Sequence, residues 1–477
     1  FFNSDTIYKK WVHYGDNEHA DKTVPERYGI EAVHHEILGF NTYENRLANY
    51  IKTYDAFQVA NLMRDFRSRN GIDKFIKNVT SEQSTMYYAY AYVSMYLVPY
   101  VYWTLEHSMK NGRDVVYFIT RDGNLLKPIA DAIIKETGWP LTTKLMYGSR
   151  KAWRVPGIDF DEDGNISETV YSNFGLFQTS FDSVDKFLQA GELTKETFEV
   201  FFPSLKNYLE MEEVSLENVV NFRNMARENK EYNEHLLRVS QEKLEIVSEY
   251  IKQEIDPTES FTVVEFWGRG YTQNSFRNIL RRTFKDDSLY SEFYYARSIY
   301  QNEEGSIRYN FTNSAKDLTF IEFLFNTVPM KTVTGYEEKD GKIVATFAEQ
   351  HSDFYAYFEK YTIEFASAFA KIDFYDKDSI LRELFDFSTD YFQRYKKDPM
   401  ILDNFSQFSD NAAIGGKDLA YAPEFTPKQM MTLRIDELSK MTKSLPMSLE
   451  KSSPLTNKIF KMRQANSRMI RKILKKK

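Results

Sequence analysis

The sequence predicts an α/β protein with a parallel sheet, because a short apolar strand, a polar turn and a helix follow one another three times. The predicted strands span 115–119, 144–147 and 261–266, and such short apolar runs are typical of strands buried on both faces. Aromatic residues make up 16% of the 477 residues, against 19 Gly and 13 Pro, which indicates helix-rich cores with few tight turns. We therefore expect a sheet flanked by helical regions.

Composition and charge limit the classes of protein to consider. The chain has no Cys, so disulfides, thiolate metal sites and cysteine nucleophiles are excluded, and a reducing cytoplasm is the simplest compartment. A net charge of −7 gives no overall attraction to nucleic acid, and no secretory signal is recognised. We expect a cytoplasmic protein that does not bind nucleic acid.

The N-terminal region, residues 1–112, is predicted to be mostly helical. Apolar residues recur at helical spacing before Asn70-Gly71, a pair that ends the element. Residues 83–105 carry no charge and are long enough to span a bilayer, but they contain seven Tyr and Pro99. Because Tyr favours membrane interfaces over the hydrocarbon centre, we predict a buried helix and not a membrane span.

The most informative stretch is 115–126. Its strand is followed by the polar turn Thr120-Arg121-Asp122-Gly123 and then by a helix over 124–135. Several backbone N–H groups remain unpaired at the start of such a helix, at the positive end of its dipole, and anions bind there. The alternative is a structural glycine turn with a solvated arginine, which needs no ligand.

Two later turns repeat this organisation. The strand 144–147 leads into residues 148–154, which carry hydroxyl and cationic groups, and the strand 261–266 leads into the glycine-flanked turn 267–273. If the strands are parallel neighbours, right-handed crossovers bring all three turns to one edge of the sheet, in a crevice where ligands bind. The residues expected there are Thr120, Arg121, Asp122, Gly123, Ser149, Arg150, Arg154, Glu265, Arg269 and Gln273.

The residue types at this edge favour a phosphorylated ligand. Several Arg side chains among hydroxyl groups and helix N-termini suit a phosphate or sugar phosphate better than an apolar ligand. Asp122 and Glu265 are the two carboxylates that would hold Mg²⁺. Alternatively, they pair with the Arg side chains, an arrangement that needs neither metal nor ligand.

The remaining segments complete the predicted domain organisation. Helices over 181–255 interrupt the sheet as a cap or partner surface, and Asp256-Pro257 ends the last of them. A strand over 289–296, a helix over 318–325, a hairpin about Asp340-Gly341 and two long helices over 349–392 follow. We expect a helical region over 1–112, a core over 113–180 and 256–347, the insertion over 181–255 and a helical region over 348–477.

Two short motifs imitate metal sites without completing them. Residues 159–167 place Asp and Gly as in a calcium loop, but Val170 stands where the bidentate Glu is needed. His34-His35-Glu36 lacks the second His, four residues after a first, that a helical zinc site requires. We interpret the first as an acidic turn and the second as ordinary surface or core.

Positive charge is concentrated at the C-terminus. Residues 451–477 hold ten Lys or Arg and no acid, and Ile459, Met462, Ile470 and Ile473 fall roughly on one helical face. This pattern predicts docking onto an anionic membrane surface at the inner face of the cell membrane, to which each basic residue contributes about 1 kcal/mol. The alternative is a solvated, frayed tail.

With these residues in view, the chain resembles bacterial proteins with a haloacid-dehalogenase-like (HAD-like) domain, found with capsule, O-antigen or teichoic acid synthesis. Similar chains carry Ser-Arg-Asp/Glu-Gly and then Phe-Leu after a strand, followed by Tyr-x-Ser-Arg-Arg-Ala, Val-Asp-Ile-Gly-Trp-x-Gly-x-x-Gln and a Gly-Tyr-Tyr-like strand. The corresponding stretches are 119–126, 147–152, 264–273 and 293–296. Their order and spacing cover about 95–370.

The resemblance implies a Rossmann-like sheet with a helical insertion and, in active members, Mg²⁺-assisted phosphoryl transfer through an aspartate nucleophile. That chemistry needs Asp-x-Asp at the end of a buried strand, one carboxylate attacking phosphorus and the other handling the proton. If 118–123 is aligned with this motif, Thr120 stands at the nucleophile position and Asp122 at the second carboxylate. If Thr120 is instead the phosphate-binding Ser/Thr of the second motif, a separate Asp-x-Asp is expected upstream, and none is found on a strand over 1–112. Glu265 replaces the Asp of the third motif. The site is therefore either completed from outside this chain or binds without hydrolysing.

We expect a HAD-like protein of surface-polysaccharide synthesis that binds, and transfers or hydrolyses, a phosphorylated sugar or polyol. Arg150, Arg154 and Arg269 would grip the anion, Thr120 would hydrogen-bond it, and Asp122 with Glu265 would place Mg²⁺ or accept a proton; Arg121, Gly123, Ser149 and Gln273 would line the phosphate site. One alternative is a degenerate module that docks a glycosyltransferase at the membrane. Another is a glycosyltransferase that uses a nucleotide sugar.

Overall fold

The computed structural model describes residues 10–15, 17–34, 39–74, 76, 79–160, 165–171, 177, 180–299, 304–314, 316–349, 352–409 and 420–474. The chain divides into two compact units, residues 1–83 and 84–477. The second unit contains a five-stranded parallel sheet, so the predicted mixed α/β architecture is confirmed at that level.

The first unit is not only helical. Two four-residue strands, β1 (Val12–Gly15) and β2 (Glu31–His34), pair in parallel across η1 (Glu18–Thr23) and α1 (Val24–Arg27). Strands this short show no alternating pattern, which is why the sequence did not reveal them. Residues 35–36 of the histidine motif lie outside the described residues.

Two helices of the first unit are held together by a buried ion pair. Glu44 on α2 (Thr42–Ile51) accepts from Arg67 on α3 (Tyr54–Arg69) at 2.6 and 2.7 Å, and both side chains are fully buried. As predicted, α3 ends at Asn70, and Gly71 follows with a φ of +63° that favours glycine. A fully paired buried charge of this kind serves structure.

The parallel sheet has the strand order β4-β3-β5-β7-β9. The strand predictions around residues 115, 144, 261 and 289 are all confirmed. The bounds are β3 Val115–Ile119, β4 Thr142–Met146, β5 Phe261–Val264, β7 Ser291–Tyr295 and β9 Ser306–Asn310. In chain order this is 2-1-3-4-5, a doubly wound order whose direction reverses between β3 and β5.

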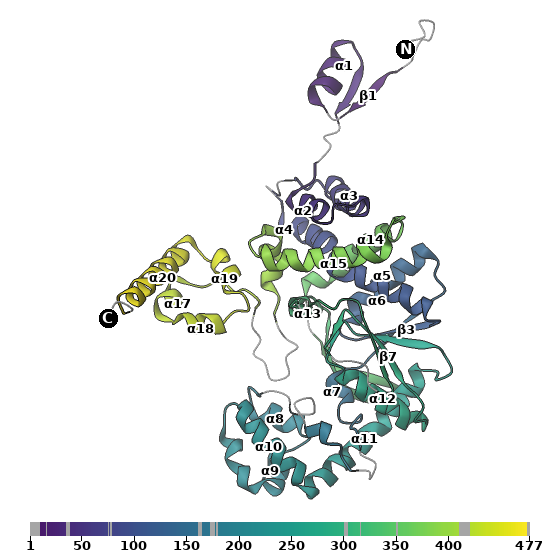
Figure 1. Cartoon of the computed structure of the whole chain (residues 1–477), viewed down its shortest axis with the longest axis vertical. Helices are drawn as coiled ribbons and strands as arrows, with labels where there is room; N and C mark the ends of the chain where they lie inside the picture. Colours follow the sequence, from purple (N-terminus) through teal and green to yellow (C-terminus); the bar gives the residue numbers. More distant parts are fainter. Residues whose placement is uncertain are drawn as a thin grey trace. The chain divides into compact units, whose positions relative to one another are not determined.

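The reversal places helices on both faces of the sheet (Figure 1). The chain reaches β4 through α6 (Gly123–Thr137), and β5 through α11 (Lys230–Glu254) on the other face. Val115, Tyr117 and Ile119 pack in one cluster with α11 and with α12 (Tyr271–Phe284). Since right-handed crossovers in opposite directions need opposite faces, the switch point lies between β3 and β5, where such sheets bind ligands.

The uncharged stretch predicted as a buried helix lies against the other face of the sheet. It forms α4 (Ser81–Tyr87), η2 (Tyr88–Val93) and α5 (Ser94–Lys110). Its tyrosines keep polar partners inside the protein: the Tyr100 hydroxyl donates to the carbonyls of Glu265 (3.1 Å) and Tyr294 (2.9 Å). None of the helices in the described part of the chain is long and apolar enough to cross a membrane.

Two long aromatic helices, predicted within 349–392, cover this layer. They are α14 (Asp353–Ala370) and α15 (Lys377–Arg394). Tyr90 meets Phe365 of α14 edge-on at 5.2 Å, and Phe311 meets Phe385 of α15 at 5.4 Å. Many of the aromatic residues of the sequence thus pack in a thick helical layer beside the sheet.

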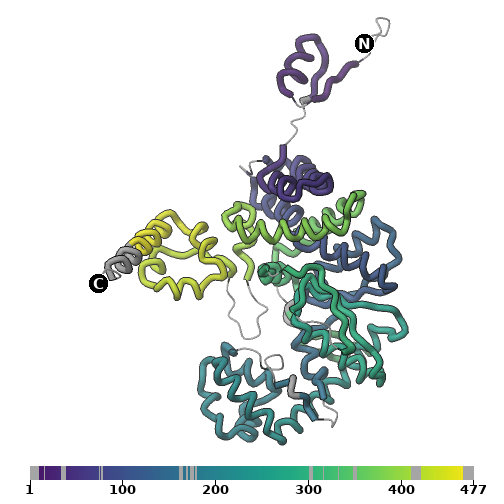
Figure 2. Tube along the Cα trace, in the orientation of Figure 1, coloured from purple at the N-terminus to yellow at the C-terminus, as the bar shows by residue number. Residues whose placement is uncertain are grey.

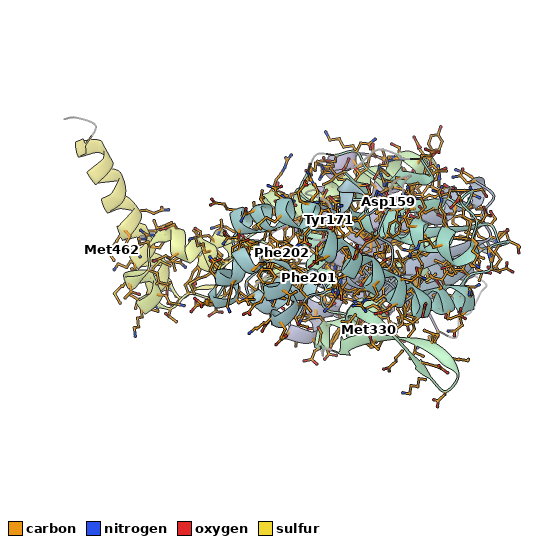
Figure 3. All side chains as sticks on the ribbon, turned by 90° about the horizontal axis from the view of Figure 1, so that it is seen from below. Asp159, Tyr171, Phe201, Phe202, Met330 and Met462 are labelled. Atoms are coloured by element: carbon orange, nitrogen blue, oxygen red, sulfur yellow. The ribbon has the colours of Figure 1, made fainter. Side chains whose placement is uncertain are left out.

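The segment between β4 and β5 forms a helical group with its own aromatic core. Phe187, Phe198 and Phe222 lie fully buried within it, and Phe202, labelled in Figure 3, joins them. Its elements are η3 (Glu168–Tyr171), α8 (Val184–Ala190), α9 (Lys195–Phe201), η4 (Pro203–Glu210), α10 (Leu216–Glu228) and α11. The calcium-like loop falls partly outside the described residues, which exclude 161–164.

The predicted hairpin is also confirmed. Strands β10 (Met330–Lys339) and β11 (Lys342–Glu349) pair in antiparallel register about Asp340 and Gly341, whose φ angles are +53° and +73°. Positive φ at both central residues defines the turn that matches the twist of a hairpin. It follows the predicted helix α13 (Thr319–Phe325).

The C-terminal helices form a small bundle, the yellow part of the trace in Figure 2. Phe425, Met430, Leu438 and Phe460 make its core. The connection from α15 includes α16 (Pro399–Asn404) and η5 (Phe405–Gln407); the bundle itself comprises α17 (Pro427–Thr432), α18 (Ile435–Lys440), α19 (Leu445–Lys451) and α20 (Pro454–Leu474). The basic tail is thus helical to Leu474, and its side chains are described to Ala465.

Candidate functional site

Asp122 ties the turn after β3 to the end of β5. It stands at the start of α6, and its Oδ2 accepts a hydrogen bond from the backbone N–H of Phe266 at 3.2 Å. The Arg121 Nε lies 3.6 Å from its other oxygen, and 15% of the Asp122 side chain remains exposed. Burial raises the pKa of Asp122, against the opposing effects of Arg121, the Phe266 N–H and Arg150.

Glu265 is the second carboxylate at this edge. Its Oε1 accepts a hydrogen bond from the Thr272 hydroxyl at 3.2 Å, and the Tyr295 hydroxyl stabilises its ionised form. Burial and the negative charge of Asp122 nevertheless raise the pKa of Glu265 to about 7. The negative charge of Asp122 therefore adds to burial in favouring the protonated form of Glu265.

Arg150 is the cation common to this group. It is the first residue of α7 (Arg150–Trp153), it is exposed, and its charge lowers the pKa of both Asp122 and Glu265. One turn later, Arg154 has a pKa lowered to about 9 by burial and by the charge of Arg150. The Arg150 and Arg154 guanidinium groups therefore lie close enough to repel each other, and Arg150 also acts on both carboxylates. An anion bound between the two cations would relieve their repulsion.

Arg121 faces away from this pair of cations. Its Nη1 donates to the side-chain carbonyl of Asn326 at 2.8 Å, while its Nε approaches Asp122. Asn326, which follows α13, donates in turn to the carbonyl of Ser409 at 2.8 Å. Arg121 thus links the turn after β3 to a much later part of the chain.

The hydroxyls of Thr120 and Ser149 bind the backbone. Thr120 Oγ1 exchanges bonds with Gly148, donating to its carbonyl (3.4 Å) and accepting from its N–H (3.3 Å). Ser149 Oγ donates to the Val333 carbonyl at 2.6 Å and accepts from the Ala152 N–H at 3.0 Å. Both hydroxyls hold neighbouring loops together, and the turns after β3 and β4 meet as predicted.

Gly123 is needed for packing. A Cβ at this position would lie 2.8 Å from the Phe118 carbonyl oxygen and 2.9 Å from Leu145 Cδ1. Glycine therefore lets α6 start directly against the sheet. In the structure, its role is close approach of backbone to backbone.

Gln273 and Arg269 lie elsewhere on the turn after β5. The Gln273 amide donates to the carbonyls of Ser291 (3.1 Å) and Ile307 (2.8 Å), and its oxygen accepts from Arg308 Nε at 2.7 Å. The exposed Arg269 guanidinium lies 5.9 Å from the centre of the Trp267 ring. The structure thus groups Arg121 and Arg150 with the carboxylates and places Arg154 near Arg150. Gln273 instead binds the protein itself, and Arg269 stacks on Trp267.

The hairpin β10–β11 fixes the loop that carries the arginines. Trp153 Nε1 donates to the Tyr336 hydroxyl at 2.6 Å, and that hydroxyl donates to the Tyr147 carbonyl at 2.7 Å. The Tyr147 N–H is satisfied by the Tyr250 hydroxyl of α11 at 2.8 Å. With the Ser149–Val333 bond, these contacts hold both ends of the loop from which Arg150 and Arg154 extend.

Sequence reasoning missed the residues around Glu265. Thr272 and Tyr295 both contact its carboxylate, and Tyr271 lies close enough to influence Arg154. Thr272 lies in the turn 267–273, directly before Gln273, and only Gln273 was predicted as a site residue. Side chains two positions apart on a strand point to the same face, so Tyr295 shares the face of Phe293, which packs with α12. This alternation is the sequence pattern that could have identified Tyr295.

The donor set for a metal ion consists of two carboxylates. No group of three or more His, Cys, Asp or Glu that could hold a metal exists among the residues that the structure describes. Mg²⁺ commonly binds one or two carboxylates and completes its shell with water and phosphate oxygens. Asp122, whose negative charge raises the pKa of Glu265, and Glu265 itself suit a cation of this kind.

The fold and the site define a class: an α/β protein with acidic and cationic groups gathered at the switch point of a parallel sheet. No protein-family model matches this chain, and no curated protein sequence shows significant similarity to it. The site's chemistry is therefore argued from its own residues.

Proposed function

We propose that the chain is a HAD-like protein of bacterial cell-surface polysaccharide synthesis (capsule, O-antigen or teichoic acid) that binds a phosphorylated sugar or polyol at the carboxyl ends of β3 and β5. The observation that carries the proposal is the pair of carboxylates Asp122 and Glu265 beside Arg150, which in turn lies near Arg154. Like charges brought together at a ligand-binding edge indicate that a counter-ion belongs there.

Arg150 and Arg154 bind the phosphate in this proposal. Each guanidinium offers paired N–H donors that match two phosphate oxygens. The anion also offsets the burial and the Arg150 charge that together lower the pKa of Arg154. Arg150 is exposed and meets the ligand first, whereas Arg154 lies deeper. The hairpin residues Val333 and Tyr336 keep both on a fixed loop.

Asp122 and Glu265 are the residues that would hold a Mg²⁺ ion at this edge of the sheet. When bound, Mg²⁺ supplies positive charge that withdraws electrons from phosphorus and stabilises the leaving oxygen. Glu265, with a pKa of about 7, exchanges a proton near neutral pH. Where Glu265 does not hold the metal, it would accept the proton that the attacking water loses as the new P–O bond forms, and the sugar oxygen would take a proton from solvent as the old P–O bond breaks.

Thr120 positions the site and does not act as the nucleophile. Its hydroxyl is engaged with both backbone groups of Gly148. An alternative function follows from this engagement, because Thr120, Ser149 and Gln273 all bind the protein itself. In that alternative the chain binds without turnover and docks a glycosyltransferase through its helical insertion.

A binding and turnover panel tests the proposal. The full chain is titrated calorimetrically with sugar phosphates, polyol phosphates, nucleotide sugars and inorganic phosphate, with and without Mg²⁺, and phosphate release is assayed in parallel. We expect binding of a phosphorylated sugar or polyol that Mg²⁺ strengthens and Arg150→Gln weakens about tenfold or more, because a bidentate contact is lost. The matched control is Arg238→Gln, an exposed arginine on α11 paired with Glu242.

The outcomes separate the three functions. Binding without phosphate release favours the docking module, and preferential binding of a nucleotide sugar favours the glycosyltransferase. If no phosphorylated compound binds in either condition, or if Arg150→Gln and Arg238→Gln behave alike, the proposed site is wrong.

A further inference from the structure

Helix α20 presents two different sides to its surroundings. Its inner side packs into the C-terminal bundle through Thr456 and Phe460, and the Arg463 guanidinium donates to the Met430 carbonyl on α17. On its outer side Leu455 is 58% exposed and Met462 is 50% exposed. Met462 is labelled in Figure 3, on the helix that extends beyond the rest of the bundle.

The outer side continues in the sequence as an apolar strip. At 100° per residue, the positions of Leu455, Met462, Met469 and Ile473 fall within about 40° of one another. Lys458, Lys461, Arg468 and Lys472 fall on the adjoining side of the same helix. An apolar strip edged by cations is the pattern of a helix that lies in the plane of a membrane surface.

The charge of this segment is of one sign. Residues 451–477 contain ten Lys or Arg and no acid, although the whole chain carries −7. The preceding acid, Glu450, is paired with Lys397 at 2.6 Å, and so is directed away from the tail's cations. An anionic surface is the complement of such a segment.

We propose that α20 docks the chain onto a lipid bilayer that contains anionic lipid, with Leu455 and Met462 inserted at the level of the headgroups. The lysine stems lie along the surface and their ammonium groups reach the lipid phosphates. This contact is peripheral and independent of the phosphate site proposed above. It places the sheet's ligand-binding edge on a protein held at a membrane.

Other occupants fit the same helix less well. A second copy of the chain would bring two strongly cationic segments together, which their repulsion opposes. A nucleic acid would bind the cations but would leave Leu455 and Met462 in water. Only a surface that is both anionic and apolar beneath its headgroups satisfies both sets of residues.

Vesicle flotation tests the proposal with the full chain. Vesicles of phosphatidylcholine alone are compared with vesicles containing 30% phosphatidylglycerol, a fraction set at about a third to give a strongly negative surface. We expect binding only to the anionic vesicles, weakened at high salt because screening shortens the attraction. Duplex DNA and size-exclusion chromatography provide the two competing outcomes.

Two matched double variants distinguish binding through the apolar strip from non-specific hydrophobic binding to vesicles. Leu455→Asp with Met462→Asp should reduce vesicle binding about tenfold or more, because charge cannot enter the headgroup boundary. The control is Leu216→Asp with Val200→Asp, which changes two residues 53% and 68% exposed on the helical insertion. All four positions are exposed, so neither variant should impair folding, and circular dichroism checks this.

Four results would overturn the proposal: equal binding to neutral vesicles, no binding to anionic ones, preferential binding of duplex DNA, or a dimer that the α20 variant dissolves. Equal loss in both double variants would also contradict it. A loss confined to Leu455→Asp with Met462→Asp, together with salt sensitivity, is the result that supports it.

Discussion

Two polar clusters lie along α12, and they differ in what satisfies them. At the β7–β9 pair, Gln273 binds two backbone carbonyls and accepts from Arg308, whose Nη2 donates to Asn274 Oδ1 at 2.9 Å. At the switch point, Thr272 of the same helix donates a hydrogen bond to Glu265, which lowers the pKa of Glu265. Burial and the charge of Asp122 have the larger effect and raise that pKa. One cluster pairs donors with acceptors, and the other brings like charges together.

The difference teaches how to separate structural from functional polar residues. A cluster whose donors and acceptors are matched stabilises the fold and needs nothing more. A cluster of like charges costs stability in the protein alone and gains it only when a proton or ligand binds. The comparison predicts opposite effects of substitution on the two sides of α12.

The largest effect is expected at the matched cluster. Gln273→Ala should lower the free energy of unfolding of the larger unit by about 3 kcal/mol, because the buried Arg308 loses its acceptor and a cavity remains. Urea unfolding measures it, with the exposed Gln189→Ala on α8 as control. A loss below about 1 kcal/mol would mean that the cluster is not structural.

An effect of the opposite sign is expected for Glu265→Gln. A carboxyl whose folded-state pKa is raised holds its proton more tightly in the folded protein, so stability falls as pH rises from 4.5 to about 7. The amide cannot ionise and keeps an acceptor for Thr272. The variant should therefore be more stable than the parent at pH 8, by about 2–3 kcal/mol, and similar to it at pH 4.5.

Unfolding curves at the two pH values measure this difference. The control is Glu242→Gln, whose side chain is 59% exposed and paired with Arg238, and which should change neither curve. A variant less stable than the parent at pH 8 would contradict the prediction. It would mean that hydrogen bonds and nearby cations stabilise the ionised Glu265, as donors and acceptors stabilise the cluster around Gln273.

The smallest effect is expected for Arg150→Gln without ligand. Arg150 lowers the pKa of Asp122 and Glu265, so its loss should move the fall in stability to higher pH. The stability at pH 8 should drop by only about 0.5–1 kcal/mol, because the side chain is exposed and screened by water. Carbon-13 NMR of the glutamate carboxyls follows the titration directly, and an unchanged midpoint would separate Arg150 from the acidic pair.

Much of the fold was predictable because it rests on local patterns. The buried strand Val115–Ile119 and the turn at Asp340-Gly341 are encoded by residues close in sequence, and the structure has both. The short strands β1 and β2 were missed because four residues carry too little pattern. The hairpin's place against Trp153 was not predictable either, because no local pattern specifies the partner of Tyr336.

The candidate site was predictable in its composition but only partly in its geometry. Strand ends identified Asp122, Arg150 and Glu265, which the structure brings together, and Arg154, which lies near Arg150. The same rule also selected Gln273, because a side chain just after a strand end can face either the open edge or the neighbouring strands. Spacing along the chain does not decide between these directions, since packing against β7 and β9 decides it.

The hairpin lies late in the chain, so the contacts that anchor the loop of Arg150 and Arg154 form late during synthesis. The ribosome delivers Arg150 and Arg154 early. Val333 and Tyr336, which anchor their loop, emerge only after the whole helical insertion and the remaining sheet strands β5, β7 and β9. A nascent chain that stops before Met330 can pair β3 with β4, but it lacks the hairpin residues that hydrogen-bond to that loop. The loop that carries both arginines therefore gains its hairpin contacts only after all strands of the parallel sheet have been synthesised.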